Sequence, residues 1–71
     1  MTLSEQFGSN LRTIRHSYGW TQQTVGNLAG LHRTEIQRLE YGKRDLRLST
    51  IVKLAGALRV DPGVLVAGMR Q

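Results

Sequence analysis

The sequence contains no cysteine among its 71 residues. This absence excludes a disulfide framework, a zinc site built on thiolates and a cysteine nucleophile. The chain also lacks an apolar run of the roughly 18 to 20 residues that a membrane-spanning helix needs. Its first ten residues, MTLSEQFGSN, lack the basic and apolar regions of a secretory signal. We therefore expect a cytoplasmic protein with no membrane segment, stabilised by packing of its secondary structure.

Acidic residues are scarce, since five Asp and Glu stand against ten Lys and Arg, and the formal net charge is +5. A basic surface raises the local concentration of polyanions such as phosphate backbones. Charge alone is weak evidence for nucleic-acid binding, because many basic domains are merely soluble. The positions of the charges must decide between these interpretations.

The sequence offers no catalytic arrangement. A single domain spanning residues 1–71 buries only roughly 60% of its unfolded surface, which leaves room for one modest core and none for a deep cleft between two lobes. No carboxylate pair, nucleophile with its base, or phosphate-binding loop can be placed. His16 and His32 do not have the spacing of metal ligands. We expect a protein that is not an enzyme and has no metal, cofactor or small-molecule ligand.

Apolar residues recur at spacings of three and four in five segments, which glycines and the single proline separate. This pattern predicts an all-α fold. Capping residues mark the helix starts: Thr2 with Glu5 fits a capping box, Thr21 is an N-cap, and Asp61 precedes Pro62 at the first position of the last helix. The expected helices run from Thr2 to Tyr18, from Thr21 to Ala29, from His32 or Arg33 to Tyr41, over about 48–58, and from Asp61 onward. The fourth is the most hydrophobic.

The window from Gln22 to Glu40 has the spacing of a helix-turn-helix. Gly26 is small enough to let two helices cross closely, and Gly30 can adopt the left-handed conformation of a tight turn. The apolar residues expected beneath this crossing are Val25, Ile36 and Leu39. The alternative is an ordinary helical hairpin with a glycine turn, but five constrained positions are satisfied together here.

These residues resemble the Cro/CI-like (XRE) family of helix-turn-helix domains over about residues 7–66. The matching pieces are Leu11–Arg15, Gly19–Gln22, Ala29–Leu31, Arg38–Arg44 and Leu54–Val60. The stretch Gly30–Thr34 also looks like that of restriction-modification controller proteins within the family. The resemblance implies a five-helix lambda-repressor-like domain, with the helix-turn-helix at about residues 21–41.

Four positions depart from the family pattern. Gly26 replaces a usual alanine, which keeps the volume small but lowers helix propensity by about 1 kcal/mol. Leu46 and Arg47 stand where many members have proline and serine, so the family pattern does not fix the start of the fourth helix. Trp20 replaces a common leucine, and we expect it to be partly buried beside the first helix.

The resemblance implies that the third helix lies in the major groove of DNA and reads base edges with its outward residues. Arg33, Thr34 and Arg38 occupy those positions, and an arginine can donate to guanine O6 and N7 together. Glu35 either accepts a hydrogen bond from cytosine N4 or only favours the positive end of its helix. Gln37 is a further candidate of the same weight. The plainer interpretation of the two arginines is that they are simply solvated.

Phosphate contacts are expected on both sides of the third helix. The family uses the glutamine at the position of Gln22 for such a contact, at the start of the second helix. His32 either contacts phosphate or caps its helix. The expected set, in which Arg12 is the weaker member, is Gln22, His32, Lys43, Arg44 and Arg12. A further possibility for Arg44 is entry into the minor groove. The charged loop could instead be an ordinary solvated loop.

Two further roles follow from the resemblance and from size. The family pairs the positions of Arg15 and Glu40 in a salt bridge between the first and third helices, so we assign these residues to structure. A single module of this size buries too little surface for tight selective binding. We therefore expect a homodimer that pairs through the region of the fourth and fifth helices, with Val64, Leu65, Val66 and Met69.

The sequence thus predicts a sequence-specific transcriptional regulator that binds double-stranded DNA as a homodimer on a two-fold operator. The alternative is a protein-interaction adaptor or an antitoxin with the same fold. The basic residues expected to face the groove favour the first hypothesis.

Overall fold

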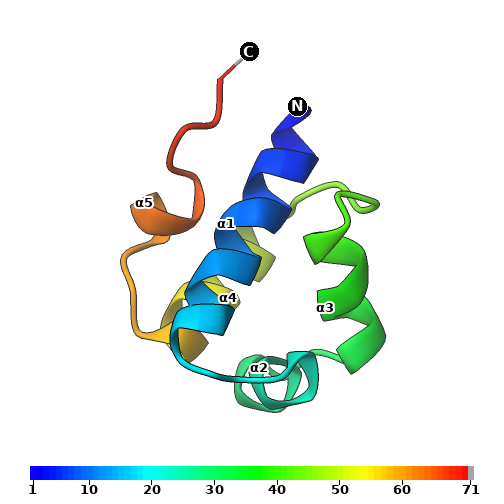
Figure 1. The fold of residues 1–71 in the computed structure, drawn as a ribbon, viewed down its shortest axis with the longest axis vertical. Helices are drawn as coiled ribbons and strands as arrows, with labels where there is room; N and C mark the ends of the chain where they lie inside the picture. The colour runs from blue at the N-terminus through cyan, green and yellow to red at the C-terminus, as the bar shows by residue number, and fades with distance from the viewer. Residues whose placement is uncertain (71) are drawn as a thin grey trace.

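The computed structural model describes residues 1–70, which form five α-helices and no strand (Figure 1). The helices are α1 (Leu3–Ser17), α2 (Gln22–Ala29), α3 (Arg33–Glu40), α4 (Leu48–Leu58) and α5 (Pro62–Leu65). The all-α prediction is confirmed, with boundaries within one or two residues of those expected. In this part of the chain no helix is long and apolar enough to cross a membrane.

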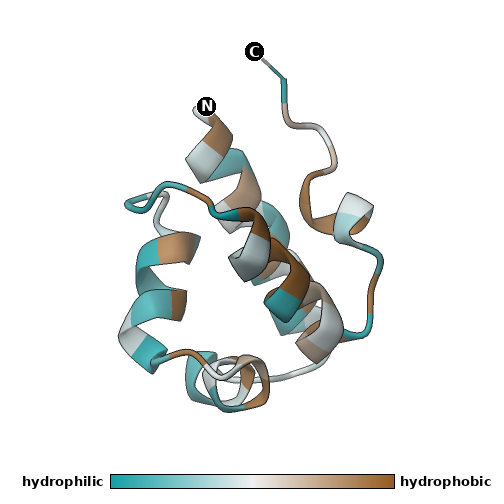
Figure 2. Ribbon diagram, turned by 180° about the vertical axis from the view of Figure 1, so that it is seen from behind, coloured by the Kyte–Doolittle hydropathy of each residue, from teal (hydrophilic) through white to brown (hydrophobic). Residues whose placement is uncertain are grey.

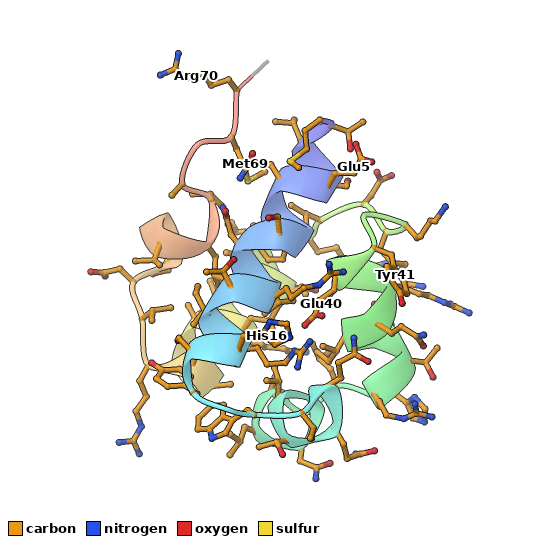
Figure 3. The ribbon with its side chains drawn as sticks, in the orientation of Figure 1. Glu5, His16, Glu40, Tyr41, Met69 and Arg70 are labelled. Atoms are coloured by element: carbon orange, nitrogen blue, oxygen red, sulfur yellow. The ribbon has the colours of Figure 1, made fainter. Side chains whose placement is uncertain are left out.

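The helices pack around α1, which runs through the middle of Figure 1. Helix α3 lies along one side of α1, α4 lies behind it, and α5 lies on the other side. Helix α2 crosses the far end of the bundle and contacts both α3 and α4. The first residues and Arg70 lie together at the end opposite α2 (Figures 1 and 3). This arrangement leaves the outer side of α3 uncovered by any other helix.

The predicted helix caps are present at α1 and α2. The hydroxyl of Thr2 accepts a hydrogen bond from the backbone N–H of Glu5 at 3.1 Å, and the Glu5 carboxylate accepts one from the backbone N–H of Thr2 at 2.8 Å. Thr21 likewise accepts from the backbone N–H of Thr24. Asp61 is the N-cap of α5, but its side chain makes no capping bond and the helix is only four residues long. Local capping chemistry therefore fixes the starts of the two helices that flank the first turn.

One core joins all five helices. Its fully or nearly fully buried apolar residues are Phe7, Leu11, Val25, Ala29, Ile36, Leu39, Leu54, Ala55, Leu58 and Leu65. Trp20 packs on this cluster as a partly buried residue, as predicted, with its ring 4.6 Å from that of Tyr18. Figure 2 shows the hydrophobic residues concentrated on α4 and the hydrophilic ones on α3.

Several apolar residues of the helical segments lie outside the core. Leu28, Leu48 and Val52 are each more than half exposed. Tyr18 is 43% exposed and uses its hydroxyl, rather than burial of its ring, to join α1 to α4: it donates to the carbonyl of Leu58 at 2.6 Å. Apolar residues at spacings of three and four identify the apolar face of a helix. That face is wider than the strip that a neighbouring helix covers, so residues at its edges stay exposed.

A close backbone approach between α1 and α3, which the sequence did not reveal, occurs at Gly8. A Cβ built on Gly8 would overlap the carbonyl oxygens of Leu39 and Glu40, the latter at 2.6 Å. No side chain fits there, so glycine sets the separation of these two helices.

The substitution Gly8→Ala should therefore destabilise the protein by roughly 2 kcal/mol, because overpacking against backbone outweighs the gain in helix propensity. Gly56 in α4 is the matched control, since a Cβ there meets nothing within 4 Å. Gly56→Ala should stabilise the protein by about 0.5 to 1 kcal/mol. Urea unfolding of both variants measures the two effects, and equal shifts would contradict this account of Gly8.

Candidate nucleic-acid interface

Helices α2 and α3 form a tight helix-turn-helix around Gly30. Gly30 has φ 71°, and the turn is closed by a hydrogen bond from the backbone N–H of Leu31 to the carbonyl of Gly26 at 2.8 Å. A Cβ on Gly26 would lie 2.6 Å from the carbonyl oxygen of Leu31. Gly30 has the predicted left-handed conformation. Gly26 allows the predicted close approach, but it is the turn that packs directly on the α2 backbone, since the nearest α3 atom, the Arg33 nitrogen, would lie 3.5 Å from the Cβ.

The two faces of α3 differ sharply. Ile36, Leu39 and Glu40 are buried against the other helices. At 3.6 residues per turn, the opposite side presents Thr34, Arg38 and Tyr41, the C-cap, with Arg33 and Gln37 on one flank and Glu35 on the other. The uncovered face of α3 therefore carries the residues predicted to read bases.

The Arg33 and Arg38 side chains are exposed and, within residues 1–70, form no ion pair. Thr34 and Gln37 are half-buried. Two arginines one turn and a residue apart on a convex helix can donate to acceptors along several base pairs. The sequence prediction thus placed these side chains on the correct face, but their role on DNA stays a prediction.

His32 is the N-cap of α3. Its Nδ1 accepts a hydrogen bond from the backbone N–H of Thr34 at 3.0 Å. An imidazole that accepts through Nδ1 in its neutral form carries its proton on Nε2, which remains free to donate. Capping is therefore established, and it leaves a donor for the phosphate contact also considered for this residue.

The basic loop, residues 42–47, begins where α3 ends. Gly42 has φ 70°, and the backbone N–H of Lys43 donates to the carbonyl of Arg38 at 2.9 Å. A Cβ on Gly42 would fall 2.7 Å from Cγ of Glu5, so this turn is packed on the first turn of α1. Lys43 and Arg44 are consequently held beside the end of α3 and are both exposed.

The carboxylate of Glu40 is the centre of a buried polar network (Figure 3). Its side chain has no exposed surface, and Arg15 donates to it through Nε at 2.6 Å and Nη2 at 2.9 Å. Arg15 also donates through Nη1 to the carbonyl of Trp20. The predicted ion pair between α1 and α3 is confirmed, and it extends to the turn before α2.

Two residues predicted to contact phosphate also belong to this network. The side-chain amide of Gln22 donates to Glu40 Oε1 at 3.1 Å, and Arg12 donates to the Glu40 carbonyl at 3.3 Å. The Arg12 guanidinium lies 5.8 Å from the centre of the Tyr41 ring and its side chain is 43% exposed. Each keeps further N–H groups for another acceptor. Their orientation is therefore set by the fold before any ligand binds.

The network shifts two pKa values. Burial opposes ionisation of Glu40, but hydrogen bonds from Arg15 and Gln22 and the charges of Arg15 and Arg12 outweigh it and lower the Glu40 pKa below its ordinary value. The pKa of Arg15 is raised, chiefly by its hydrogen bond to Glu40. Both groups are therefore charged over the whole physiological pH range.

Sequence reasoning missed two features of this surface. Glu35 forms an ion pair with Arg44, at 2.8 Å between Oε2 and Nη2, which joins α3 to the basic loop. Tyr41 is 57% exposed on the same side of α3 as Arg38. Its spacing of three from Arg38 was the available signal for Tyr41, whereas nothing in the sequence indicates how the loop carries Arg44 back to Glu35.

The residues predicted to form a dimer interface are not equivalent. Val64 is 46% exposed, but Leu65 is fully buried in the core of its own chain, and Met69 is partly buried against that core. Leu65 is therefore wrong as a residue presented to a partner, because the last helix turns it inward. The exposed apolar residues of this part of the chain are Leu48, Val52, Val64 and Val66.

A protein-family model described as helix-turn-helix matches residues 11–65 of the chain. The control protein C.SmaI of Serratia marcescens is 36% identical over 61 residues, which cover 86% of this chain and 73% of that protein. The solved structure of the restriction-modification controller protein C.AhdI from Aeromonas hydrophila is 39% identical, with a TM-score of 0.85, and the match covers 87% of this chain and 94% of that one.

The P22 c2 repressor, solved in complex with a synthetic operator, superposes with a TM-score of 0.79 over 87% of this chain and 94% of that one. Its sequence identity is 22%, so this likeness concerns the fold. The five-helix, lambda-repressor-like architecture predicted from the sequence is confirmed by these superpositions.

Replacing Glu40 by Gln should lower the free energy of unfolding at pH 7 by roughly 2 kcal/mol, because Arg15 loses a charged acceptor. A carboxyl whose pKa is lowered on folding contributes stability above its unfolded pKa and loses it as the pH falls through the folded pKa. The difference between wild type and Glu40→Gln should therefore shrink as the pH is lowered below about 4.3.

Urea unfolding at a series of pH values measures this difference. Asp61→Asn is the control, because it removes an exposed carboxylate that makes no capping bond. A wild-type advantage over Glu40→Gln that stayed constant down to pH 2 would show that the ionised pair does not stabilise the fold.

Proposed function

Because the chain belongs to the helix-turn-helix family of Cro/CI-like (XRE) DNA-binding transcriptional regulators, we propose that it binds a specific two-fold operator as a homodimer, with α3 in the major groove. The resemblance drawn from residues 7–66, including its likeness to restriction-modification controllers, is confirmed by the matches. The named relatives are controllers and a repressor, not enzymes.

One observation carries the proposal: α3 is the one helix of residues 1–70 whose uncovered face is lined by arginines without an ion-pair partner. Arg33 and Arg38 are therefore available to base edges. An arginine fork donates to guanine O6 and N7 together, and Thr34 between them offers a hydroxyl and a methyl group. Gln37 lies on the flank beside Arg33 and can donate or accept.

The phosphate contacts proposed on either side of the groove come from Gln22, His32, Lys43, Arg44 and Arg12. Four of these five are held by intramolecular hydrogen bonds or ion pairs, and Lys43 is held through its backbone. A surface whose donors are already oriented loses less conformational entropy on binding. The proposed interface is therefore largely formed in the free protein.

For the dimer, we propose an apolar surface made of Leu48, Val52, Val64 and Val66. Thr50, Lys53 and Ala57 line clefts that also involve α3 or α2, so helical spacing places Leu48 and Val52 on the flank of α4 away from those helices. Helix α5 contacts α4, and its exposed valines can extend this surface. Pairing here leaves both copies of α3 free to enter successive major grooves, about 34 Å apart.

Selection from random duplexes, followed by anisotropy titration of the selected site, tests the proposal as a whole. We expect a site of two-fold symmetry with half-sites one helical turn apart. Equal affinity for every duplex would overturn sequence-specific binding, and no binding at low salt would favour a protein-interaction adaptor.

Substituting Arg33 or Arg38 by Ala should cost about 1 to 3 kcal/mol of binding free energy and relax the preference at one position of the half-site. Lys43→Ala should weaken all duplexes alike and reduce the salt dependence by about one counterion. Arg70→Ala is the charge-matched control, because Arg70 lies at the end of the molecule opposite α2, away from α3 (Figure 3). An equal loss in all four variants would point to net charge alone.

Val52→Glu should give a monomer in sedimentation experiments and bind a single half-site as well as the full operator, because it places a charge in the proposed apolar interface. Leu28→Glu is the matched control, since Leu28 is equally exposed, at 54% against 56%, but lies on α2. A dimer that persisted in Val52→Glu, or was lost in Leu28→Glu, would place the interface elsewhere.

A further inference from the structure

The ion pair between Glu35 and Arg44 is the one link between the side chains of α3 and those of the basic loop in the described residues. Glu35 lies in the first turn of α3, two residues after Arg33, and Arg44 lies in the loop that follows the helix. The Glu35 and Arg44 side chains are 27% and 42% exposed. The pair is therefore accessible to a ligand and is not part of the core.

The pair borders an open polar cleft of about 520 Å³ between α3, the loop and α4, which Arg47 and Lys53 also line. Helical spacing puts Glu35 on the flank of α3 that faces this cleft, away from Arg33 and Gln37. Glu35 is thus turned from the centre of the proposed reading face, which argues against the base contact considered for it. Its carboxylate instead forms the ion pair with Arg44.

A carboxylate beside a DNA backbone weakens binding unless it is neutralised. Arg44 neutralises Glu35, but Glu35 equally restrains Arg44. The guanidinium approaches Glu35 through Nη2 at 2.8 Å, and because a guanidinium carries five N–H groups, Arg44 keeps donors for another acceptor while it is paired. To follow phosphates at other positions, Arg44 would have to leave Glu35 and uncover a negative charge next to the duplex.

We propose that Glu35 is a positioning residue that determines specificity: it holds Arg44 in one place, so that Arg44 serves a duplex bound in the operator register and not an arbitrary one. The inference rests on the proposed function. Binding to arbitrary DNA depends almost wholly on phosphate contacts, whereas operator binding also uses base contacts. Restraining Arg44, which contacts phosphate, therefore lowers the affinity for arbitrary DNA more than the affinity for the operator.

The test compares Glu35→Gln with Asp45→Asn, using the operator from random-duplex selection and a scrambled duplex of the same length. Both substitutions remove one negative charge, and Asp45 is the exposed neighbour of Arg44 and lines the same cleft without an ion pair. Relative to Asp45→Asn, we expect Glu35→Gln to bind the scrambled duplex about fivefold more tightly, with a salt slope steeper by about one. The ratio of operator to scrambled affinity should fall by a similar factor.

The double variant Glu35→Gln with Arg44→Gln shows whether Glu35 acts through Arg44. In the Arg44→Gln background, replacing Glu35 should raise scrambled-duplex affinity no more than Asp45→Asn does. Thermal unfolding checks that the variants are folded, which the position of these side chains outside the hydrophobic core favours.

The inference is overturned if Glu35→Gln and Asp45→Asn behave alike, or if the effect of Glu35→Gln is unchanged without Arg44. In both cases wild-type protein would still discriminate its operator, and the proposed function would stand. Failure of every protein, wild type included, to bind any duplex at low salt would instead overturn the proposed function and this inference with it.

Discussion

The buried carboxylate of Glu40 is the interaction on which the shape of the proposed DNA-binding surface depends. Glu40 is the last residue of α3, and its partners are Arg15 of α1 and Gln22 at the start of α2. Arg15 in turn holds the carbonyl of Trp20, just before α2. Three helices are thus joined through one carboxylate that has no exposed surface. An unpaired charge at this place would be costly in folding free energy. The network sets the angle at which α3 is presented and also restrains the phosphate-contacting residues proposed beside it.

Small residues complete this arrangement where the backbones meet. Gly8 lets α1 approach the end of α3, and Gly26 lets the turn after α2 lie directly on that helix. The approach at Gly8 brings α1 close to the backbone of Glu40, so the polar network and the close packing operate at the same crossing. The hydrophobic core stabilises the five helices together, but the polar network of Glu40 and the close packing at the two glycines determine how far apart the helices lie.

Features that depend on neighbouring residues in the chain were predictable from the sequence. The caps at Thr2 and Thr21 and the left-handed turn at Gly30 follow from local chemistry that the sequence displays directly. The outward face of α3 followed from helical periodicity together with the family resemblance. By contrast, the role of Gly8, the inward turn of Leu65 and the pairing of Glu35 with Arg44 depend on contacts between distant segments. Leu28 and Leu65 are both leucines in helical segments, yet Leu28 is exposed and Leu65 is buried. The packing of α5 against α1 and α4 accounts for the burial of Leu65.

The contact between Gly42 and Glu5 links two turns that are far apart in the sequence. The turn at the start of the basic loop packs on the backbone and side chain of Glu5 in the first turn of α1. A Cβ on Gly42 would lie 2.7 to 3.0 Å from three atoms of Glu5. The turn that leads to Lys43 and Arg44 therefore takes its position from the first turn of α1, which the capping box of Thr2 and Glu5 holds. A residue larger than glycine at position 42 would require a different path for the first turn of α1, because two of the three Glu5 atoms that its Cβ would meet, N and Cα, belong to the backbone.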